Sequence, residues 1–441
     1  MPTNNDTVIN PLEGPLIGST RVPGDKSISH RAILFSAMAE GTSRVQGVLD
    51  SDDVRSSIAA VRALGADVSL ERALDGSLQG GITGWGAEGP RQPQDPIDCG
   101  NSGTTVRLLM GVLAPWDISV TLTGDDSLVT RPMRRVTFPL MKMGVRFMPE
   151  ERATLPLTER GTAKLRPIEY DTPVASAQLK TAILLAGLFA EGVTTVNEPA
   201  PSRNHTELML PQYGAQTMVS ERSASVRGPV RLHACEIAVP GDPSSAAFIA
   251  CAAALKPGSR VQIENVSVNP ARIGFVRMLE NMGADISVSG TGSSGKERFG
   301  TISILFNDHL TGTEVPGRKI AGLVDEIPVL SLVAARAHGI TVFRDAGELR
   351  VKESDRMQAI IDGLAQIGVN AWNEADDLFI EGNPDLSVPA GLTFDSHGDH
   401  RLAMTWAVLG MTADVPVAIK GFEAVTVSFP TFLTQFERLV H

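Results

Sequence analysis

The sequence predicts an α/β protein of two similar halves, with apolar helices inside and strands around them. Three observations support this fold class: a short motif recurs near mid-chain, a helix–strand unit recurs along the whole chain, and one helix of each unit is apolar on nearly every face. The length of 441 residues also exceeds that of a comfortable single core, so two domains are expected.

The recurring motif is Val-Pro-Gly-Asp, which begins at Val22 and again at Val239, an offset of 239 − 22 = 217 residues. Two halves of this length account for nearly the whole chain. We therefore expect one domain over residues 22–240 and a second over residues 1–21 plus 241–441. Hinges are expected where the chain crosses between them, near residues 21–24 and 239–241, because both crossings contain Pro-Gly.

Each half divides again, into units of about one sixth of the 441 residues. A unit consists of a buried helix, a strand, a loop, an amphipathic helix, a glycine and a second strand. A glycine directly after an amphipathic helix occupies the C′ position, which requires a positive φ. These glycines are Gly65, Gly144, Gly214, Gly283 and Gly368.

The first helix of each unit is predicted to be buried, because it is apolar or small on nearly all faces. The second helices, such as residues 54–64 and 355–367, carry charge and are expected in the outer layer. The six expected buried helices are residues 29–39, 104–113, 176–190, 244–255, 327–337 and 400–409.

The starts of these buried helices indicate anion binding. Their Ser, Thr, Asp and Asn residues are partly ordinary N-caps. Lys26, Arg31, Arg107 and Arg401 lie in first turns, where a cation opposes the helix macrodipole unless an anion is bound. If the buried helices of each half run parallel, their positive ends converge. Strand-to-helix loops add Arg131, Arg134, Arg203, Lys352 and Arg356.

The overall charge of the chain indicates what kind of ligand these cations bind. The chain has 39 Lys and Arg against 50 Asp and Glu, a net charge of −11. An acidic protein that gathers cations at equivalent loops is expected to bind a small ligand with several negative charges. For any single arginine, the alternative to ligand binding is a solvated position on the surface. The same acidity argues against a nucleic-acid partner.

Two acidic residues in the same segments are candidates for proton transfer. Asp325 precedes a fully apolar helical segment, and Glu353 lies within Lys-Glu-Ser-Asp-Arg. A carboxylate among cations can act as a general acid or base. The alternatives are an N-cap for Asp325 and a solvated ion pair for Glu353.

Other function classes find little support in the sequence. Three widely spaced cysteines form neither a disulfide framework nor a metal cluster, and His397 with His400 is too few ligands for a metal. The longest apolar stretch, around residues 182–190, is too short to span a bilayer. The N-terminal segment lacks the pattern of a signal or transit peptide, so we expect a cytoplasmic protein with no membrane partner.

Five motifs, in order along nearly the whole chain, resemble signatures of the 5-enolpyruvylshikimate-3-phosphate synthase (3-phosphoshikimate 1-carboxyvinyltransferase) family. The resemblance implies an enolpyruvyl transferase fold: two domains of three βαβαββ units each, with parallel buried helices inside the sheets, that close on their substrates. It implies transfer of a carboxyvinyl group from phosphoenolpyruvate to shikimate 3-phosphate, with release of phosphate, by a monomer without cofactor or metal. The resemblance further implies that glyphosate would occupy the phosphoenolpyruvate site. The motifs are residues 23–32, 100–107, 131–133, 351–356 and 399–404.

Matching motif by motif, the resemblance also implies roles for individual residues. Asp325 would be the base for the attacking hydroxyl, Glu353 the proton donor to the enol carbon, and Lys26 a third catalytic residue. The residues implied to bind shikimate 3-phosphate are Lys26, Ser27, Arg31, Ser176, Gln178, Ser202, Arg203, Asp325 and Lys352. Those implied to bind phosphoenolpyruvate are Lys26, Gly103, Arg131, Gln178, Arg356 and Arg401.

The chain departs from the family's better-known members at three places. Val427 stands where a Lys is usual, His205 where a Tyr is common, and Ala177 where a second Ser is found. These departures resemble a second bacterial subclass, in which Arg203 would contact the phosphate. The roles of Val427 and His205 stay open.

Other interpretations also stay open from the sequence. The sister enzyme UDP-N-acetylglucosamine enolpyruvyl transferase shares the fold, but it has Cys where this chain has Asp126 and Asn where it has Ser27. A non-catalytic anion-binding protein on the same scaffold would be expected to lack Lys26, Asp325 or Glu353. An RNA-end cyclase of related fold would need an RNA partner, which the net charge of −11 disfavours.

Overall fold

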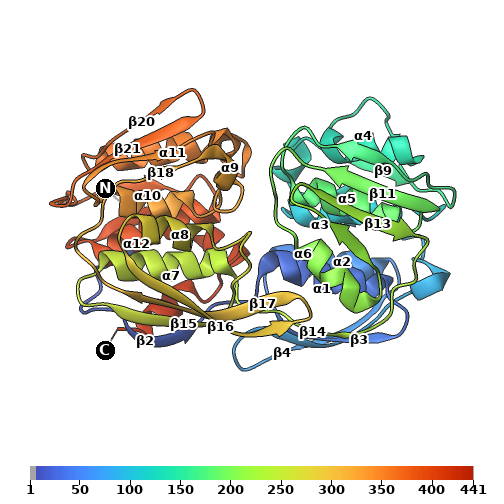
Figure 1. Cartoon of the computed structure of the whole chain (residues 1–441), viewed down its shortest axis with the longest axis horizontal. Helices are drawn as coiled ribbons and strands as arrows, with labels where there is room; N and C mark the ends of the chain where they lie inside the picture. Colours follow the sequence, from blue (N-terminus) through green and yellow to red (C-terminus); the bar gives the residue numbers. More distant parts are fainter. Residues whose placement is uncertain (1–5, 441) are drawn as a thin grey trace. The chain divides into compact units, whose positions relative to one another are not determined.

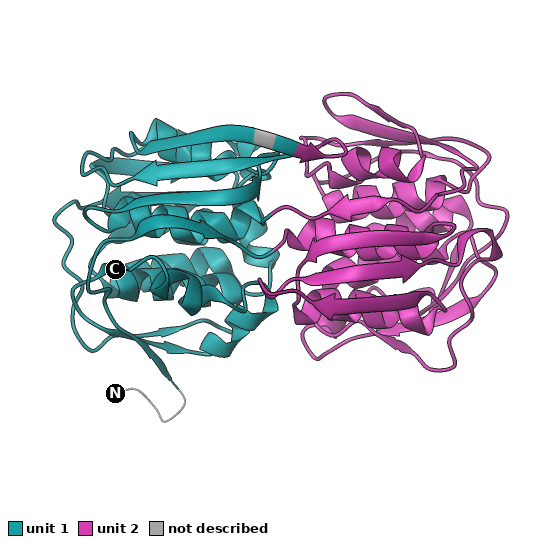
Figure 2. Cartoon of the chain, turned by 90° about the horizontal axis from the view of Figure 1, so that it is seen from below, with its two compact units in different colours: residues 1–23, 241–292, 298–441 teal, residues 24–240, 293–297 magenta. Residues whose placement is uncertain are grey.

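The computed structural model describes residues 6–440, which divide into two compact units (Figure 2). Unit 2 consists of Gly24–Pro240 and Ser293–Glu297, and unit 1 of the segments before, between and after these. The chain thus passes between units after Pro23 and after Pro240. It does so again at the tip of a hairpin, residues 293–297, which the sequence analysis did not anticipate.

Three four-stranded sheets build unit 2, and all three share one plan: the first strand in each order pairs parallel with its neighbour, and the other pairs are antiparallel. The orders are β14-β3-β5-β4, β6-β7-β9-β8 and β10-β11-β13-β12. The strands are β3 (Thr42–Val48), β4 (Asp67–Arg72), β5 (Leu78–Thr83), β6 (Ile97–Asp98), β7 (Ser119–Thr123), β8 (Arg146–Met148), β9 (Leu157–Arg160), β10 (Glu169–Asp171), β11 (Gly192–Asn197), β12 (Thr217–Val219), β13 (Ser223–Gly228) and β14 (Glu236–Ala238).

Two sheets of unit 1 also carry a parallel pair at one edge: β2 pairs parallel with β15 in the order β16-β17-β15-β2, and β18 pairs parallel with β19 in the order β18-β19-β21-β20. Its third sheet has only three strands, β1-β23-β22, with β1 supplied by the N-terminal segment. The strands are β1 (Thr7–Ile9), β2 (Ile17–Arg21), β15 (Arg260–Ser267), β16 (Asp285–Ser294), β17 (Glu297–Leu305), β18 (Glu314–Val315), β19 (Gly339–Phe343), β20 (Asn370–Glu374), β21 (Asp377–Gly382), β22 (Thr393–Asp395) and β23 (Val417–Lys420).

The six predicted buried helices all form, and within each unit the strands lie around them (Figure 1). All thirteen residues of α7 and of α12 are buried, as expected for helices that are apolar on every face. The buried helices are α1 (Lys26–Met38), α3 (Gly103–Leu113) and α5 (Ala177–Gly187) in unit 2, and α7 (Pro243–Leu255), α10 (Ile327–Ala335) and α12 (His400–Thr412) in unit 1.

The remaining helices are shorter or amphipathic. The five predicted C′ glycines all have positive φ, between 79° and 113°. The other helices are α2 (Asp52–Ala63), α4 (Arg134–Met143), α6 (His205–Met209), α8 (Gly274–Asn281), α9 (Gly317–Ile320), α11 (Arg356–Gln366) and α13 (Phe432–Glu437).

Each unit has a hydrophobic core of its own, one drawn from residues 28–239 and the other from residues 9–22 and 246–439. The α/β fold class of the sequence analysis is therefore confirmed. Within residues 6–440, no helix is both long and apolar enough to span a membrane.

Candidate active site

The start of α1 holds the first group of predicted site residues in unit 2. Asp25 caps this helix: its Oδ1 accepts the backbone N–H of Ile28, in the first turn, at 2.8 Å. Lys26 Nζ lies 3.0 Å from Oδ2 of Asp53, at the start of α2. The cation in the first turn of α1 therefore has a carboxylate partner within the protein.

Arg31 is buried, with 2% of its surface exposed, and its guanidinium group joins three helices. Nε donates to Thr206 Oγ1 in α6 (2.8 Å), and Nη2 donates to Thr181 Oγ1 in α5 (2.7 Å). Nη1 donates to the carbonyl oxygen of Ser27 at 2.9 Å. These contacts make Arg31 a residue that positions Ser27, and a direct contact with a substrate stays a prediction.

At the start of α3, a glycine lies beside two arginine side chains. Ser102 caps the helix by accepting the N–H of Thr105, and Gly103 is its first residue. A Cβ at Gly103 would lie 2.9 Å from Arg107 Nη1 and 3.5 Å from Arg131 Nη1. Two guanidinium groups beside the positive end of a helix favour binding of a phosphate or carboxylate.

Hydrogen bonds to amide side chains hold both arginines. Arg131 Nη2 donates to Asn101 Oδ1 at 2.6 Å. Arg107 Nη1 donates to Gln178 Oε1 at 2.8 Å, and Gln178 Nε2 donates to Thr104 Oγ1 at 2.9 Å. Gln178 thus connects the first turn of α5 to the first turn of α3.

The start of α5 and the loop after β11 carry the remaining predicted residues of unit 2. Ser176 caps α5 by accepting a backbone N–H, and Arg203 is half-buried just before α6. Ser202 is 8% exposed, and its Oγ has no hydrogen-bond partner among residues 6–440. A buried hydroxyl without a partner costs free energy, which a bound ligand would recover.

In unit 1, the predicted residues form one network of charges around Arg356, which is 1% exposed. Arg356 Nη1 lies 3.1 Å from Asp325 Oδ1, and Nη2 lies 2.6 Å from Glu353 Oε2. Nε donates to Asp399 Oδ2 at 2.8 Å. Asp399 also caps α12 by accepting the N–H of Arg401.

Electrostatics within this network favour the charged forms. Burial alone would lower the pKa of Arg356, but the carboxylates of Asp399, Glu353 and Asp325 raise it above its ordinary value. Burial would likewise raise the pKa of Asp399, and the adjacent guanidinium of Arg356 lowers it below the ordinary value.

Asp325 lies among three cations. Besides Arg356, Lys352 Nζ is 3.8 Å from Asp325 Oδ1, and Arg401 Nη2 is 3.9 Å from Oδ2. The alternative that Asp325 caps the following helix is wrong, because α10 begins at Ile327 and Glu326 occupies the N-cap position. Glu353 does form an ion pair, with a side chain that is 30% exposed.

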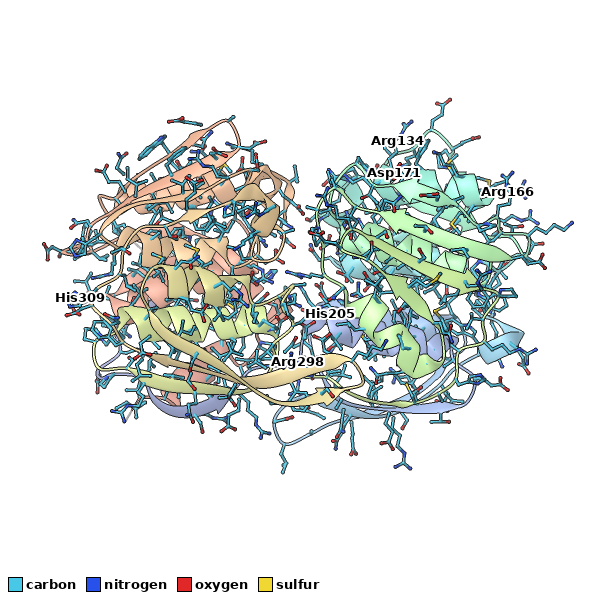
Figure 3. All side chains as sticks on the ribbon, in the orientation of Figure 1. Arg134, Arg166, Asp171, His205, Arg298 and His309 are labelled. Carbon is cyan, nitrogen blue, oxygen red and sulfur yellow. The ribbon has the colours of Figure 1, made fainter. Side chains whose placement is uncertain are left out.

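Several residues of these networks were missed by the sequence analysis. Asp53, Asn101 and Asp399 each hold a predicted cation in place. Asn101 and Asp399 carried a signal, since each precedes a buried helix in one of the quoted motifs, whereas Asp53 lies outside those motifs. Arg134 proves to be exposed at the start of α4 (Figure 3), where the surface alternative applies.

The structure also shows what His205 does. It begins α6 (Figure 3), and its Nδ1 lies 3.2 Å from Oε2 of Glu297, in the part of the β16–β17 hairpin that belongs to unit 2. Both side chains are buried. His205 is therefore a packing and hydrogen-bonding residue in unit 2. Val427 is the last residue of a short 3₁₀ helix, Phe422–Val427.

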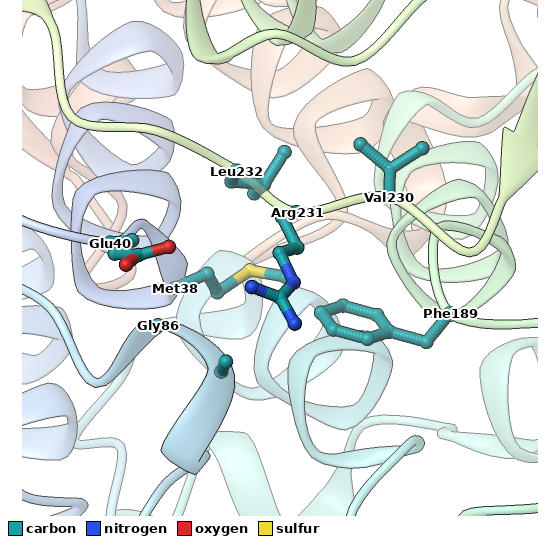
Figure 4. A pocket seen from close by; sticks show the side chains of 8 residues that line it. Met38, Glu40, Gly86, Phe189, Val230, Arg231 and Leu232 are labelled. Carbon is teal, nitrogen blue, oxygen red and sulfur yellow. The ribbon is translucent and has the colours of Figure 1, made fainter.

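Neither a metal site nor a large cavity offers an alternative to these clusters within residues 6–440. No group of three His, Cys, Asp or Glu residues suited to a metal occurs within residues 6–440. A cavity of about 30 Å³ in unit 2 is lined by Met38, Glu40, Phe189 and Arg231, among others (Figure 4). It is far smaller than a typical ligand pocket, and Met38 ends α1, at the opposite end from Lys26.

Comparisons with known proteins agree with this chemistry. The family model of EPSP synthase (3-phosphoshikimate 1-carboxyvinyltransferase) matches residues 12–436. The chain is similar to the 3-phosphoshikimate 1-carboxyvinyltransferases of Desulforamulus reducens, with 45% identity over 97% of both chains, and of Desulfitobacterium hafniense, with 46% identity over 98% of both.

Solved structures give the same result. The EPSP synthase of Acinetobacter baumannii superposes with a TM-score of 0.88 at 40% identity, covering 99% of this chain and 98% of that one. The enolpyruvyl transferase NikO of Streptomyces tendae superposes with a TM-score of 0.78 at 17% identity, covering 99% and 98%, which is a likeness of fold alone.

Proposed function

The chain belongs to the EPSP synthase family, and we propose that it carries out the family's reaction through the charged residues described above. The enzyme transfers the enolpyruvyl group of phosphoenolpyruvate to the 5-hydroxyl of shikimate 3-phosphate and releases inorganic phosphate. This step belongs to the shikimate pathway to aromatic amino acids. The family match over residues 12–436 is the observation that carries the proposal, and it favours this enzyme over its sister transferase and over a non-catalytic binder.

For shikimate 3-phosphate, we propose that unit 2 supplies Lys26, Ser27, Gln178, Ser202 and Arg203 together with the capped start of α5 at Ser176. The buried hydroxyl of Ser202 supports its part, because a phosphate oxygen would give it the missing partner. Arg31 acts on this substrate through its bond to the Ser27 carbonyl. Unit 1 supplies Asp325 and Lys352.

For phosphoenolpyruvate, we propose that Arg131 and the start of α3 at Gly103 are the main anchors in unit 2. The absence of a Cβ at Gly103 lets an anion approach the helix N–H groups and both neighbouring guanidinium groups. Lys26 and Gln178 also contribute there, and unit 1 supplies Arg356 and Arg401.

The proposed chemistry is an addition followed by an elimination. The 5-hydroxyl oxygen forms a bond to C2 of phosphoenolpyruvate while Asp325 accepts the hydroxyl proton and Glu353 donates a proton to C3. The resulting tetrahedral intermediate is not covalently bound to the protein. Glu353, now a carboxylate, then takes a proton from C3 while phosphate leaves C2, which restores the double bond, and Lys26 stabilises the developing charge on the phosphate.

The test is release of phosphate from phosphoenolpyruvate that depends on shikimate 3-phosphate. Glu353→Gln and Asp325→Asn should lower kcat by at least about a hundredfold, the usual contribution of a general acid or base. Arg134→Gln is the control, because Arg134 is exposed and outside both networks. Phosphate release that requires UDP-N-acetylglucosamine instead would assign the chain to the sister activity.

The assembly and compartment are further parts of the proposal. We propose a monomer that meets its two charged substrates in the cytoplasm without cofactor or metal. Sedimentation equilibrium over a wide range of protein concentrations tests the first point, and full activity after dialysis against a chelator tests the last.

A further inference from the structure

A buried group of three charged side chains in unit 2 lies outside the residues assigned above. Lys180, one turn into α5, has its Nζ 2.7 Å from Glu198 Oε2 and 2.8 Å from Glu207 Oε1. The three side chains are only 3–4% exposed. An ion group this well buried costs desolvation free energy, so it contributes weakly to stability compared with an apolar replacement.

The two carboxylates stand at the two ends of one loop. Glu198 directly follows β11, and Glu207 lies in α6. Residues 199–206 connect them and include Ser202 and Arg203. Because one ammonium group binds both carboxylates, Lys180 fixes the distance between the two ends of this loop.

The same group reaches the start of α5. Glu198 uses its second oxygen, Oε1, to accept the backbone N–H of Ser176 at 3.1 Å. Ser176 is the N-cap of α5, and its own Oγ accepts the N–H of Leu179. Lys180 therefore acts on the loop and on the helix start through a single carboxylate.

We propose that Lys180 is a positioning residue for shikimate 3-phosphate: with Glu198 and Glu207, it holds Ser176, Ser202 and Arg203 in the arrangement that binds this substrate. The inference rests on the proposed function. The proposal explains why three charged side chains are buried here, where apolar side chains would make the protein at least as stable. Met or Leu could neither accept the N–H of Ser176 nor connect the two ends of the loop.

Three variants test the proposal. Lys180→Met alone leaves two carboxylates buried without a cation and is expected to be unstable. The neutral triple variant Lys180→Met/Glu198→Gln/Glu207→Gln keeps side-chain size and removes all three charges, so it should fold. Lys180→Arg keeps the charge. Lys142→Met is the matched control, because Lys142 lies in α4 of the same unit and contacts only the rings of Phe138 and Tyr170 among its described partners.

In the neutral triple variant, KM for shikimate 3-phosphate should rise about tenfold to a hundredfold, the cost of misplacing binding groups by a fraction of an ångström to an ångström. KM for phosphoenolpyruvate should change less than about threefold, because the anchors at α3 keep their partners. Lys180→Arg keeps the ion group, so its KM for shikimate 3-phosphate should stay close to that of the parent. Calorimetric titration with shikimate 3-phosphate should likewise show the parent and Lys180→Arg binding more tightly than the triple variant.

Two results would overturn the inference: a triple variant with unchanged KM for shikimate 3-phosphate, or one that unfolds or loses both substrates equally. The latter would make the charges structural. Failure of the proposed function looks different, because the parent protein and Lys142→Met would then release no phosphate with shikimate 3-phosphate present.

Discussion

Replacing Gly103 with alanine adds one methyl group at the start of α3. The new Cβ would lie 2.9 Å from Arg107 Nη1, closer than real Cβ contacts allow, and 3.5 Å from Arg131 Nη1. The Arg107 side chain must move, because its terminal atoms are the flexible part of the contact. Arg107 Nη1 also donates to Gln178 Oε1 at 2.8 Å, so the shift weakens the connection between α3 and α5.

The fold itself should tolerate this substitution. Gly103 does not have a positive φ, in contrast to Gly100 nearby, whose φ is 55°. Alanine is also favoured over glycine within a helix, by up to about 1 kcal/mol. The thermal midpoint of unfolding should therefore stay close to that of the parent, and any kinetic change can be assigned to the site.

The two ligands of the site should respond differently. Phosphoenolpyruvate is the shorter anion, and its KM should rise only about threefold. Glyphosate is longer, and a rigid clash in a packed site costs roughly 2–3 kcal/mol, so its inhibition constant should rise about 30-fold to 150-fold. Initial rates measured over both concentrations give the two constants from one data set.

The control for this experiment is Gly81→Ala in β5, where the nearest atom to a new Cβ is a side-chain methyl at 3.4 Å. It should change neither constant. If the KM for phosphoenolpyruvate and the glyphosate inhibition constant rose equally in folded Gly103→Ala, the glycine would be needed only to make room for the arginine side chains and not for the ligands. An unchanged glyphosate constant would refute the steric reasoning outright.

Three further predictions follow from the charges. Arg131→Ala and Arg401→Ala should each raise KM for phosphoenolpyruvate by roughly thirtyfold (about 2 kcal/mol) with a smaller effect on shikimate 3-phosphate, and equal effects in steady-state kinetics would contradict the assignment. Asp399→Asn should lower the free energy of unfolding in urea by about 3 kcal/mol, because Arg356 stays buried with one fewer carboxylate, and an unchanged midpoint would count against this. Burial lowers the pKa of His30 from 6.5 to about 3, so stability is fully present above pH 6.5 and is lost as the pH falls toward 3. Between pH 6 and pH 4, the free energy of unfolding measured in urea should fall less steeply in His30→Asn than in the parent, by about 1.4 kcal/mol per pH unit. Parallel plots of this free energy against pH for the two proteins would exclude His30 as the cause.

The fold was largely predictable because it depends on local signals. The C′ glycines at positions 65, 144, 214, 283 and 368 all adopt positive φ. Asp25, Ser102 and Ser176 all cap the helices they precede. These signals act within a few residues, and the repeat made each one visible several times.

The parts that escaped prediction depend on contacts between distant segments. Asp53 and Lys26 lie 27 positions apart, and Asn101 and Arg131 lie 30 apart. No local pattern links such pairs. The hairpin tip at residues 293–297 and the partner of His205, Glu297, escaped for the same reason. The buried position of Arg31 also depends on its hydrogen bonds to α5 and α6, and no local pattern links α1 to these helices.

The duplicated Val-Pro-Gly-Asp motif separates what the fold requires from what the chemistry requires. In both copies the aspartate caps a buried helix: Asp25 for α1 and Asp242 for α7. The next residue differs, because Lys26 follows the first aspartate and Pro243 follows the second. In the second copy, Asp242 Oδ1 instead binds Nη2 of buried Arg272 at 2.7 Å. The cap is thus retained for folding, and only the copy with Lys26 keeps a first-turn cation that can meet an anion.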